Sequence, residues 1–160
     1  MDRSRTAEGR SETLIARKAE TPDLPLPGDN GQRLQVNVLY TTHSKTLAAL
    51  RITSRLGAEL GACPKVLLLY AVPYTLPLER PAVPAGFLEE RIRALARESP
   101  TEITARIILC REPQRSLRQT LRPHSLIVIG GRKGWWPSKE QRVAWRLSRD
   151  GHEVIFASLE

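Results

Sequence analysis

The sequence SLIVIGGRKG at residues 125–134 decides the fold, because a short apolar run leads directly into a glycine pair and two cations. Strands that are covered on both faces, as in parallel sheets, are nearly continuous apolar runs. Residues 34–40 (LQVNVLY) and 65–72 (KVLLLYAV) have the same character. These stretches predict buried strands of one parallel sheet, and the fourth of its strands ends at a glycine loop.

Working outward from this stretch, strand-like and helix-like segments alternate along the chain. The predicted strands are residues 34–40, 65–72, 103–109, 125–129 and 153–158, and the predicted helices are 46–60, 87–98, 114–122 and 138–149. Five strands with four intervening helices predict an open α/β domain with a parallel sheet and helices on both faces.

Several residues mark the ends and faces of the predicted helices. Thr42 or Ser44 can cap the helix at 46–60 and Gly61 can end it, while Ser138 and Gln141 form a capping-box pattern. Leu117 and Leu121 are expected to face inward from the helix at 114–122. The apolar spacing places Leu47, Ala48, Ile52, Leu56 and Leu60 near one face of the helix at 46–60, which is typical of an amphipathic helix.

The predicted domain covers residues 34–160 and follows a tail. Residues 1–33 contain PDLPLPGDNG and show no sustained period, so we interpret them as a disordered tail with a transient helix near residues 13–19. The longest apolar run, at 66–72, is too short for a membrane span, and the first residues lack a signal-peptide core. Two cysteines and three scattered histidines indicate neither a disulfide framework nor a metal site. We therefore expect a cytoplasmic protein without membrane contact.

The positive charge is concentrated in the predicted domain. The net charge is +8, yet residues 1–33 carry six basic and six acidic side chains, which leaves the whole excess to residues 34–160. No acidic residue lies between Glu112 and Glu140, where six basic residues do. Such a field favours an anionic small molecule, a nucleic acid or an acidic partner, and the alternative is a solvated face that only keeps the protein soluble.

Two loops are the candidate ligand site, because doubly wound sheets bind ligands where the strand order reverses. If the first and fourth strands are neighbours, residues 41–44 (TTHS) meet the glycine loop. The candidate binding residues are Thr41, Val72, Gly130, Gly131, Arg132 and Gly134. Glycine N–H groups, two cations and a helix N-terminus suit a phosphate, and the alternative is a tight turn with surface cations. Neither a Walker loop nor a dinucleotide fingerprint is present, because no GK[ST] ends the motif and the glycine spacing differs.

Other side chains near these loops leave more than one interpretation. His43 is expected to be a capping or surface residue, with phosphate donor or general base as the alternative. No nucleophile is paired with it by a recognisable motif, so we predict no catalytic residues. Trp135 and Trp136 are expected to form a hydrophobic lid over the end of the sheet, and the alternative is stacking on a base or docking a partner.

The strings LYTTHSKTLAALRITSRLGAELGA, KVLLLYAVP and SLIVIGGRKG resemble the universal stress protein family over nearly all of residues 34–160. The resemblance implies the fold of the adenine nucleotide alpha hydrolase-like group, with sheet order 3-2-1-4-5 and a homodimer formed through the last strand. Many members bind ATP through G-x2-G-x9-G-[ST] and an aspartate at the end of the first strand. Here Thr41 stands at the aspartate position, and neither Gly130 nor Gly131 starts a complete motif.

The resemblance and the altered motif together give the functional expectation. We expect a non-catalytic module in stress response or regulation with lost or weakened ATP binding and no required cofactor. The alternatives are a nucleic-acid or acidic-partner binding protein that uses the basic surface of residues 115–149, and an ATP-binding universal stress protein.

Overall fold

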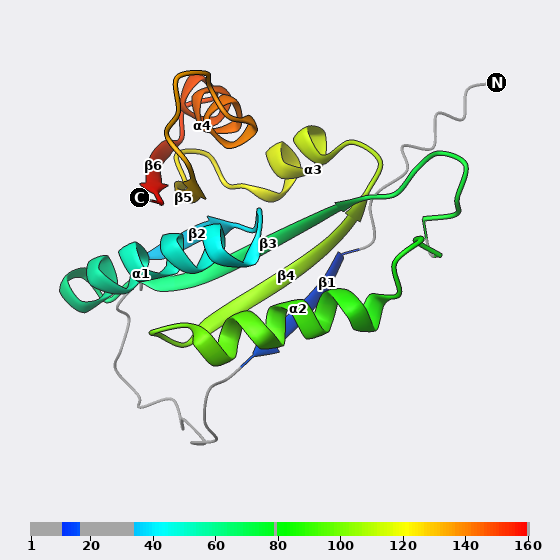
Figure 1. Ribbon diagram of the computed structural model, residues 1–160, viewed down its shortest axis with the longest axis horizontal. Coiled ribbons are helices and arrows are strands. Elements are labelled where there is room, and N and C mark those ends of the chain that lie inside the picture. The colour runs from blue at the N-terminus through cyan, green and yellow to red at the C-terminus, as the bar shows by residue number, and fades with distance from the viewer. Residues whose placement is uncertain (1–10, 17–33, 79, 160) are drawn as a thin grey trace.

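The computed structural model describes residues 11–16, 34–78 and 80–159. These residues form an α/β fold with a single sheet that has helices on both faces. The strands are β1 (Ser11–Ala16), β2 (Gln35–Leu39), β3 (Cys63–Ala71), β4 (Ile103–Cys110), β5 (Leu126–Gly131) and β6 (Glu153–Ser158). The helices are α1 (His43–Leu60), α2 (Ala85–Glu98), α3 (Pro113–Thr120) and α4 (Lys139–Arg149). Figure 1 shows their arrangement.

The order of the parallel strands is β4-β3-β2-β5-β6, which confirms the predicted order 3-2-1-4-5. Val38 is paired with Val66 of β3 on one side and with Val128 of β5 on the other. β2 and β5 are therefore the central neighbours, as the candidate site requires. The winding reverses between them, and we call the carboxyl ends of β2 and β5 the switch point.

One strand was not expected from the sequence. β1 adds to the outer side of β4 in antiparallel register, from Ser11 opposite Ile108 to Ala16 opposite Ile103 (Figure 1). The prediction of a helix near residues 13–19 is therefore wrong for residues 13–16. Residues 17–19 and the remainder of the predicted disordered tail lie outside the described residues.

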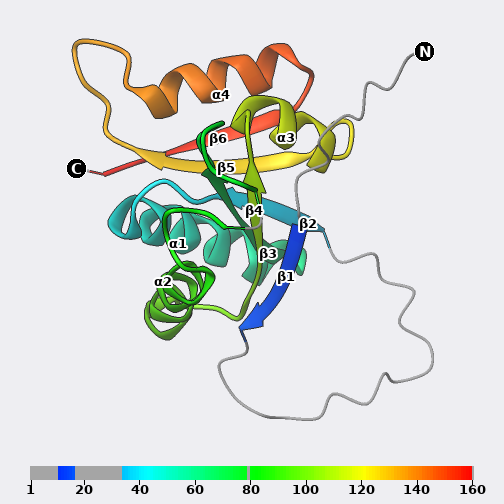
Figure 2. The same cartoon turned by 90° about the vertical axis from the view of Figure 1, so that its right-hand side faces the viewer.

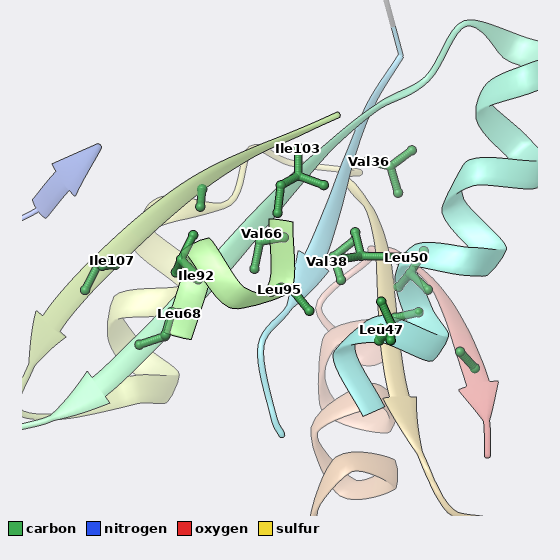
Figure 3. Packing of buried hydrophobic residues seen from close by; sticks show 14 of the residues in the cluster. Val36, Val38, Leu47, Leu50, Val66, Leu68, Ile92, Leu95, Ile103 and Ile107 are labelled. Carbon is green, nitrogen blue, oxygen red and sulfur yellow. The ribbon is translucent and has the colours of Figure 1, made fainter. Parts of the chain in front are cut away.

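Two hydrophobic cores hold the helices on the sheet. Figure 2 shows α1 and α2 on one face and α3 and α4 on the other. Below α1 and α2, Leu50 and Ile92 are fully buried against the strand residues Val38 and Val66 (Figure 3). The opposite core contains Leu117 and Leu121, which confirms their predicted inward orientation, together with Ala144, Leu147 and apolar residues of β2, β3 and β5.

Capping residues explain where α1 and α4 begin or end, and the buried side of α1 differs in part from the predicted one. Thr42 caps α1, Gly61 ends it at φ 63°, and Ser138 and Gln141 form the complete capping box of α4. The buried side of α1, however, consists of Thr46, Leu47, Ala49, Leu50 and Thr53. Of the predicted apolar face, Leu47 is buried and Ile52 packs against the core, whereas Leu60 is 58% exposed. The two threonines are tolerated inside because each hydroxyl donates to the carbonyl four residues earlier.

Candidate functional site

The two predicted loops converge at the switch point. Thr41 follows β2, and its hydroxyl donates to the Gly130 carbonyl of β5 at 3.5 Å. The Thr41 N–H also donates to the Thr46 hydroxyl of α1 at 3.2 Å. These bonds tie the end of β2, the first turn of α1 and the end of β5 into one unit.

Gly130 and Gly131 serve close packing at this point. A Cβ atom on Gly130 would lie 1.8 Å from the Lys45 carbonyl oxygen, so α1 passes directly against the strand. A Cβ on Gly131 would lie 2.5 Å from the Phe156 ring and 3.1 Å from Glu140 Cβ. Both glycines belong to β5 and continue its pairing with β6. The local sequence thus needs glycine because α1, α4 and β6 all approach the end of β5.

An ion pair joins the two helix layers over this edge of the sheet. Lys45 Nζ, in the first turn of α1, donates to Glu140 Oε1, in the first turn of α4, at 2.7 Å. The two side chains are only 23% and 14% exposed. A charged pair with this little solvent is held in a lower dielectric than a surface pair, so its attraction is stronger.

The pKa of Glu140 follows from this environment. Partial burial acts to raise it, but hydrogen bonds from Lys45, the Glu140 N–H and Ser138, together with the Lys45 charge, outweigh burial and lower it below its ordinary value. The carboxylate is therefore the stable form, and it lies at the N-terminus of α4, where negative charge is favoured. In chemical terms, Glu140 supplies an anion to Lys45 and to the start of α4.

The remaining predicted site residues do not join this cluster. Val72 is buried beyond the end of β3, and its N–H donates to the Cys110 carbonyl of β4 at 2.8 Å. Arg111 donates to the carbonyls of Val72 and Pro73 and fixes that loop. Arg132 and Gly134 are exposed in the connection from β5 to α4, which bends outward from the sheet (Figure 2). Three of the six candidates, Thr41, Gly130 and Gly131, therefore come together.

The interpretation of Trp135 and Trp136 as a lid over the sheet is wrong. Their side chains are 94% and 79% exposed, so they cover no core. Both tryptophans precede Pro137 and the cap of α4 at Ser138, so they belong to the connection and not to the helix that returns to the sheet. His43 agrees with the surface interpretation, because its Nε2 lies 3.1 Å from Glu98 of α2.

Lys45 and Glu140 are the residues that sequence reasoning missed. They lie 95 positions apart, and only the pairing of β2 with β5 brings their helices together. One signal was present: Glu140 is the first acidic residue after Glu112 in a strongly basic segment, and it falls in the first turn of a helix.

No family model, no curated protein and no solved structure matches the chain. Among the described helices, none combines the length and apolar character needed to cross a membrane. The site is therefore interpreted from its own geometry, which is that of a doubly wound parallel sheet whose switch point is spanned by an internal ion pair.

Proposed function

We propose that this protein is a non-catalytic, universal-stress-protein-like module that acts in stress response or regulation, with ATP binding of the usual kind lost or much weakened. The observation that carries the proposal is the Lys45–Glu140 pair at 2.7 Å across the switch point. A ligand phosphate would have to displace the Glu140 carboxylate from Lys45 and from the N-terminus of α4. The Thr41 hydroxyl, engaged with the Gly130 carbonyl, supplies no negative charge where the family motif has an aspartate.

Titration calorimetry with Mg-ATP tests this proposal. We expect wild-type protein to bind with a dissociation constant weaker than about 100 μM, which corresponds to less than about 5.5 kcal/mol of binding free energy. The variant Glu140→Ala frees Lys45 for an external phosphate and should bind roughly 10- to 100-fold more tightly, the equivalent of about one charge-assisted hydrogen bond.

Two controls separate local from general charge effects. Glu59→Ala removes an exposed carboxylate from the last turn of α1 and should leave ATP affinity unchanged. Lys45→Met combined with Glu140→Ala should abolish the gain. A sub-micromolar dissociation constant for wild-type protein would contradict the proposal.

We also propose a homodimer formed through β6. This strand is the last of the sheet order, and an edge strand carries backbone groups available for pairing. The N–H groups of Glu153 and Leu159 donate to β5, so by alternation those of Val154, Phe156 and Ser158 point to the outer edge. Antiparallel pairing of two copies about Phe156 would place Ser158 opposite Val154 of the second copy.

Sedimentation equilibrium tests the dimer. Wild-type protein should sediment at twice the chain mass of 18.0 kDa. Ser158→Pro removes an outward N–H without removing a donor to β5 and should shift the protein to monomer, whereas Ser158→Ala should remain dimeric. A monomeric wild-type protein, or equal dimerisation of the two variants, would contradict pairing through β6. The free thiols Cys63 and Cys110 suit the cytoplasmic location that the proposal implies.

A further inference from the structure

All three tryptophans of the chain are exposed, and together with five exposed cations they lie in one stretch of sequence, from the connection after β5 through α4. We call the surface of this stretch the tryptophan–arginine face, and its exposed members are Arg132, Lys133, Trp135, Trp136, Lys139, Arg142, Trp145 and Arg149. It consists of the outward connection after β5 and the solvent side of α4. The Lys45–Glu140 pair and the β6 edge are not part of it.

The helical spacing places the α4 members on a single stripe. At 100° per residue, Lys139, Arg142, Trp145 and Arg149 fall within about 120° of one another, over a length of about 15 Å. The opposite side of the helix carries Ala144 and Leu147, which are buried against the sheet. The stripe therefore points away from the core, with one indole among three cations.

The exposure of the indoles is unusual for residues of this size. Trp135, Trp136 and Trp145 are 94%, 79% and 59% exposed, although Trp ordinarily buries much of its area. Clusters of large exposed apolar side chains mark interaction sites. Three indoles within eleven residues therefore indicate that this face has a partner.

The charges of the face are not neutralised by the described protein. Within residues 34–78 and 80–159, none of its five cations forms an ion pair. The nearby carboxylates are already engaged, because Glu140 pairs with Lys45 and Asp150 pairs with Arg118. On the other side of the sheet, α2 carries three acidic and three basic residues, and Arg93 and Arg97 pair with glutamates of the same helix. The α4 side thus carries five exposed cations without an ion pair in the described part of the chain, whereas the charges of α2 are balanced within that helix.

We infer that the tryptophan–arginine face binds single-stranded nucleic acid. Bases stack on exposed aromatic rings with little sequence preference, and the cations between the rings contact successive phosphates. A duplex conceals its bases from such stacking, so single strands are the better match. This inference goes beyond the proposed function, since it requires neither the switch point nor a bound nucleotide.

An anionic membrane is the other polyanionic surface, and the composition of α4 argues against it. A helix that lies in a membrane interface inserts an apolar face. The apolar face of α4 is already packed on the sheet, and its solvent side presents one tryptophan among lysine, arginine and serine residues. The nucleic acid therefore fits this surface better than lipid does.

Intrinsic fluorescence gives a direct test, because every tryptophan of the full chain belongs to the proposed surface. A titration with oligo(dT) or oligo(rU) should quench the emission and saturate. With three to five phosphates contacted, the logarithm of the binding constant should fall against the logarithm of salt concentration with a slope of about −2 to −3.5. A duplex of equal length should bind more weakly, and anionic phosphatidylserine vesicles should not bind at comparable charge concentration.

Variants assign the effect to the face. Trp145→Ala, and separately Trp135→Ala with Trp136→Ala, should weaken oligonucleotide binding roughly 5- to 150-fold per indole, measured by anisotropy of a labelled strand. Arg142→Ala with Arg149→Ala should reduce the salt slope by about 1.4, or 0.7 per lost phosphate contact. The matched pair Arg51→Ala with Arg55→Ala, exposed on α1, should change neither.

The result that overturns the inference is equally concrete. It fails if folded wild-type protein shows no saturable quenching, if duplex binds as tightly as single strand, or if the tryptophan variants bind normally. Vesicle binding without oligonucleotide binding would overturn it in favour of a membrane surface. Circular dichroism checks that each variant is folded, and the exposed positions make unfolding an unexpected outcome.

Discussion

Gly130→Ala should lower the free energy of unfolding by about 3 kcal/mol or more, which is at the upper end of the usual cost of overpacking. The added Cβ would lie 1.8 Å from the Lys45 carbonyl oxygen, which is backbone and cannot rotate away. The first turn of α1 is held by its Thr42 cap and by the bond from Lys45 to Glu140, so relief requires the whole turn to move. Urea denaturation followed by circular dichroism measures the loss.

Gly134→Ala is the matched control for this substitution. It lies in the connection directly after β5, and the nearest neighbour of an added Cβ would be the Trp136 carbonyl oxygen at 3.7 Å, an ordinary contact. We expect its stability to stay within about 0.5 kcal/mol of wild type. Equal stability of the two variants would mean that α1 does not pack against the end of β5.

Leu50→Ala should cost about 2–5 kcal/mol, the range for truncating a buried leucine. Leu50 is fully buried between α1 and the sheet, near Val38 (Figure 3), in the larger core that also contains Val128. Since whole domains are stable by only about 5–15 kcal/mol, such a loss is a large share of the total.

Leu60→Ala, in the last turn of the same helix, removes the same atoms from a side chain that is 58% exposed. Its cost should stay near or below about 0.5 kcal/mol, measured by the same urea titration. If the two truncations cost the same, Leu50 would be no more deeply buried than Leu60, which would contradict the observed burial along α1.

The sequence was sufficient for the parallel strands because their information is local. The runs that form β2, β3 and β5 are apolar on both sides, and this pattern arises where helices cover both faces of a sheet. The cap of α4 was equally local, since Ser138 and Gln141 are three residues apart. Strand β1 could not be predicted in this way, because SETLIA is a strand only through its pairing with β4.

The location of the site could be predicted from the sequence, but the ion pair that occupies it could not. Convergence of Thr41 with Gly130 follows from the strand order and the rule that ligands bind at the reversal. The ion pair depends on two helices that are far apart in the sequence, so no local pattern could reveal it. The burial of Thr46 and Thr53 in α1 was also not predicted. Their hydroxyls donate to carbonyls of the preceding turn, so these polar side chains can be buried without an unpaired donor.

The Lys45–Glu140 pair has a consequence for pH. Because the pKa of folded Glu140 lies below its ordinary value of 4.5, the pair stabilises the fold fully above that pH. This contribution is lost as the pH falls through the lower pKa of the folded state. Glu140→Gln should therefore be less stable than wild type at neutral pH, and the difference should shrink in acid.

Direct NMR titration of the Glu140 side-chain carboxyl, in wild-type protein and in Lys45→Met, tests most sharply whether the switch point is spanned by this pair. We predict a wild-type pKa below 4.5 that rises when Lys45 is replaced. Burial disfavours the Glu140 carboxylate, and without Lys45 it loses the hydrogen bond and the positive charge that stabilise it. An ordinary pKa that does not respond to Lys45→Met would contradict the account, since Glu140 would then be facing water and the switch point would be open to a ligand.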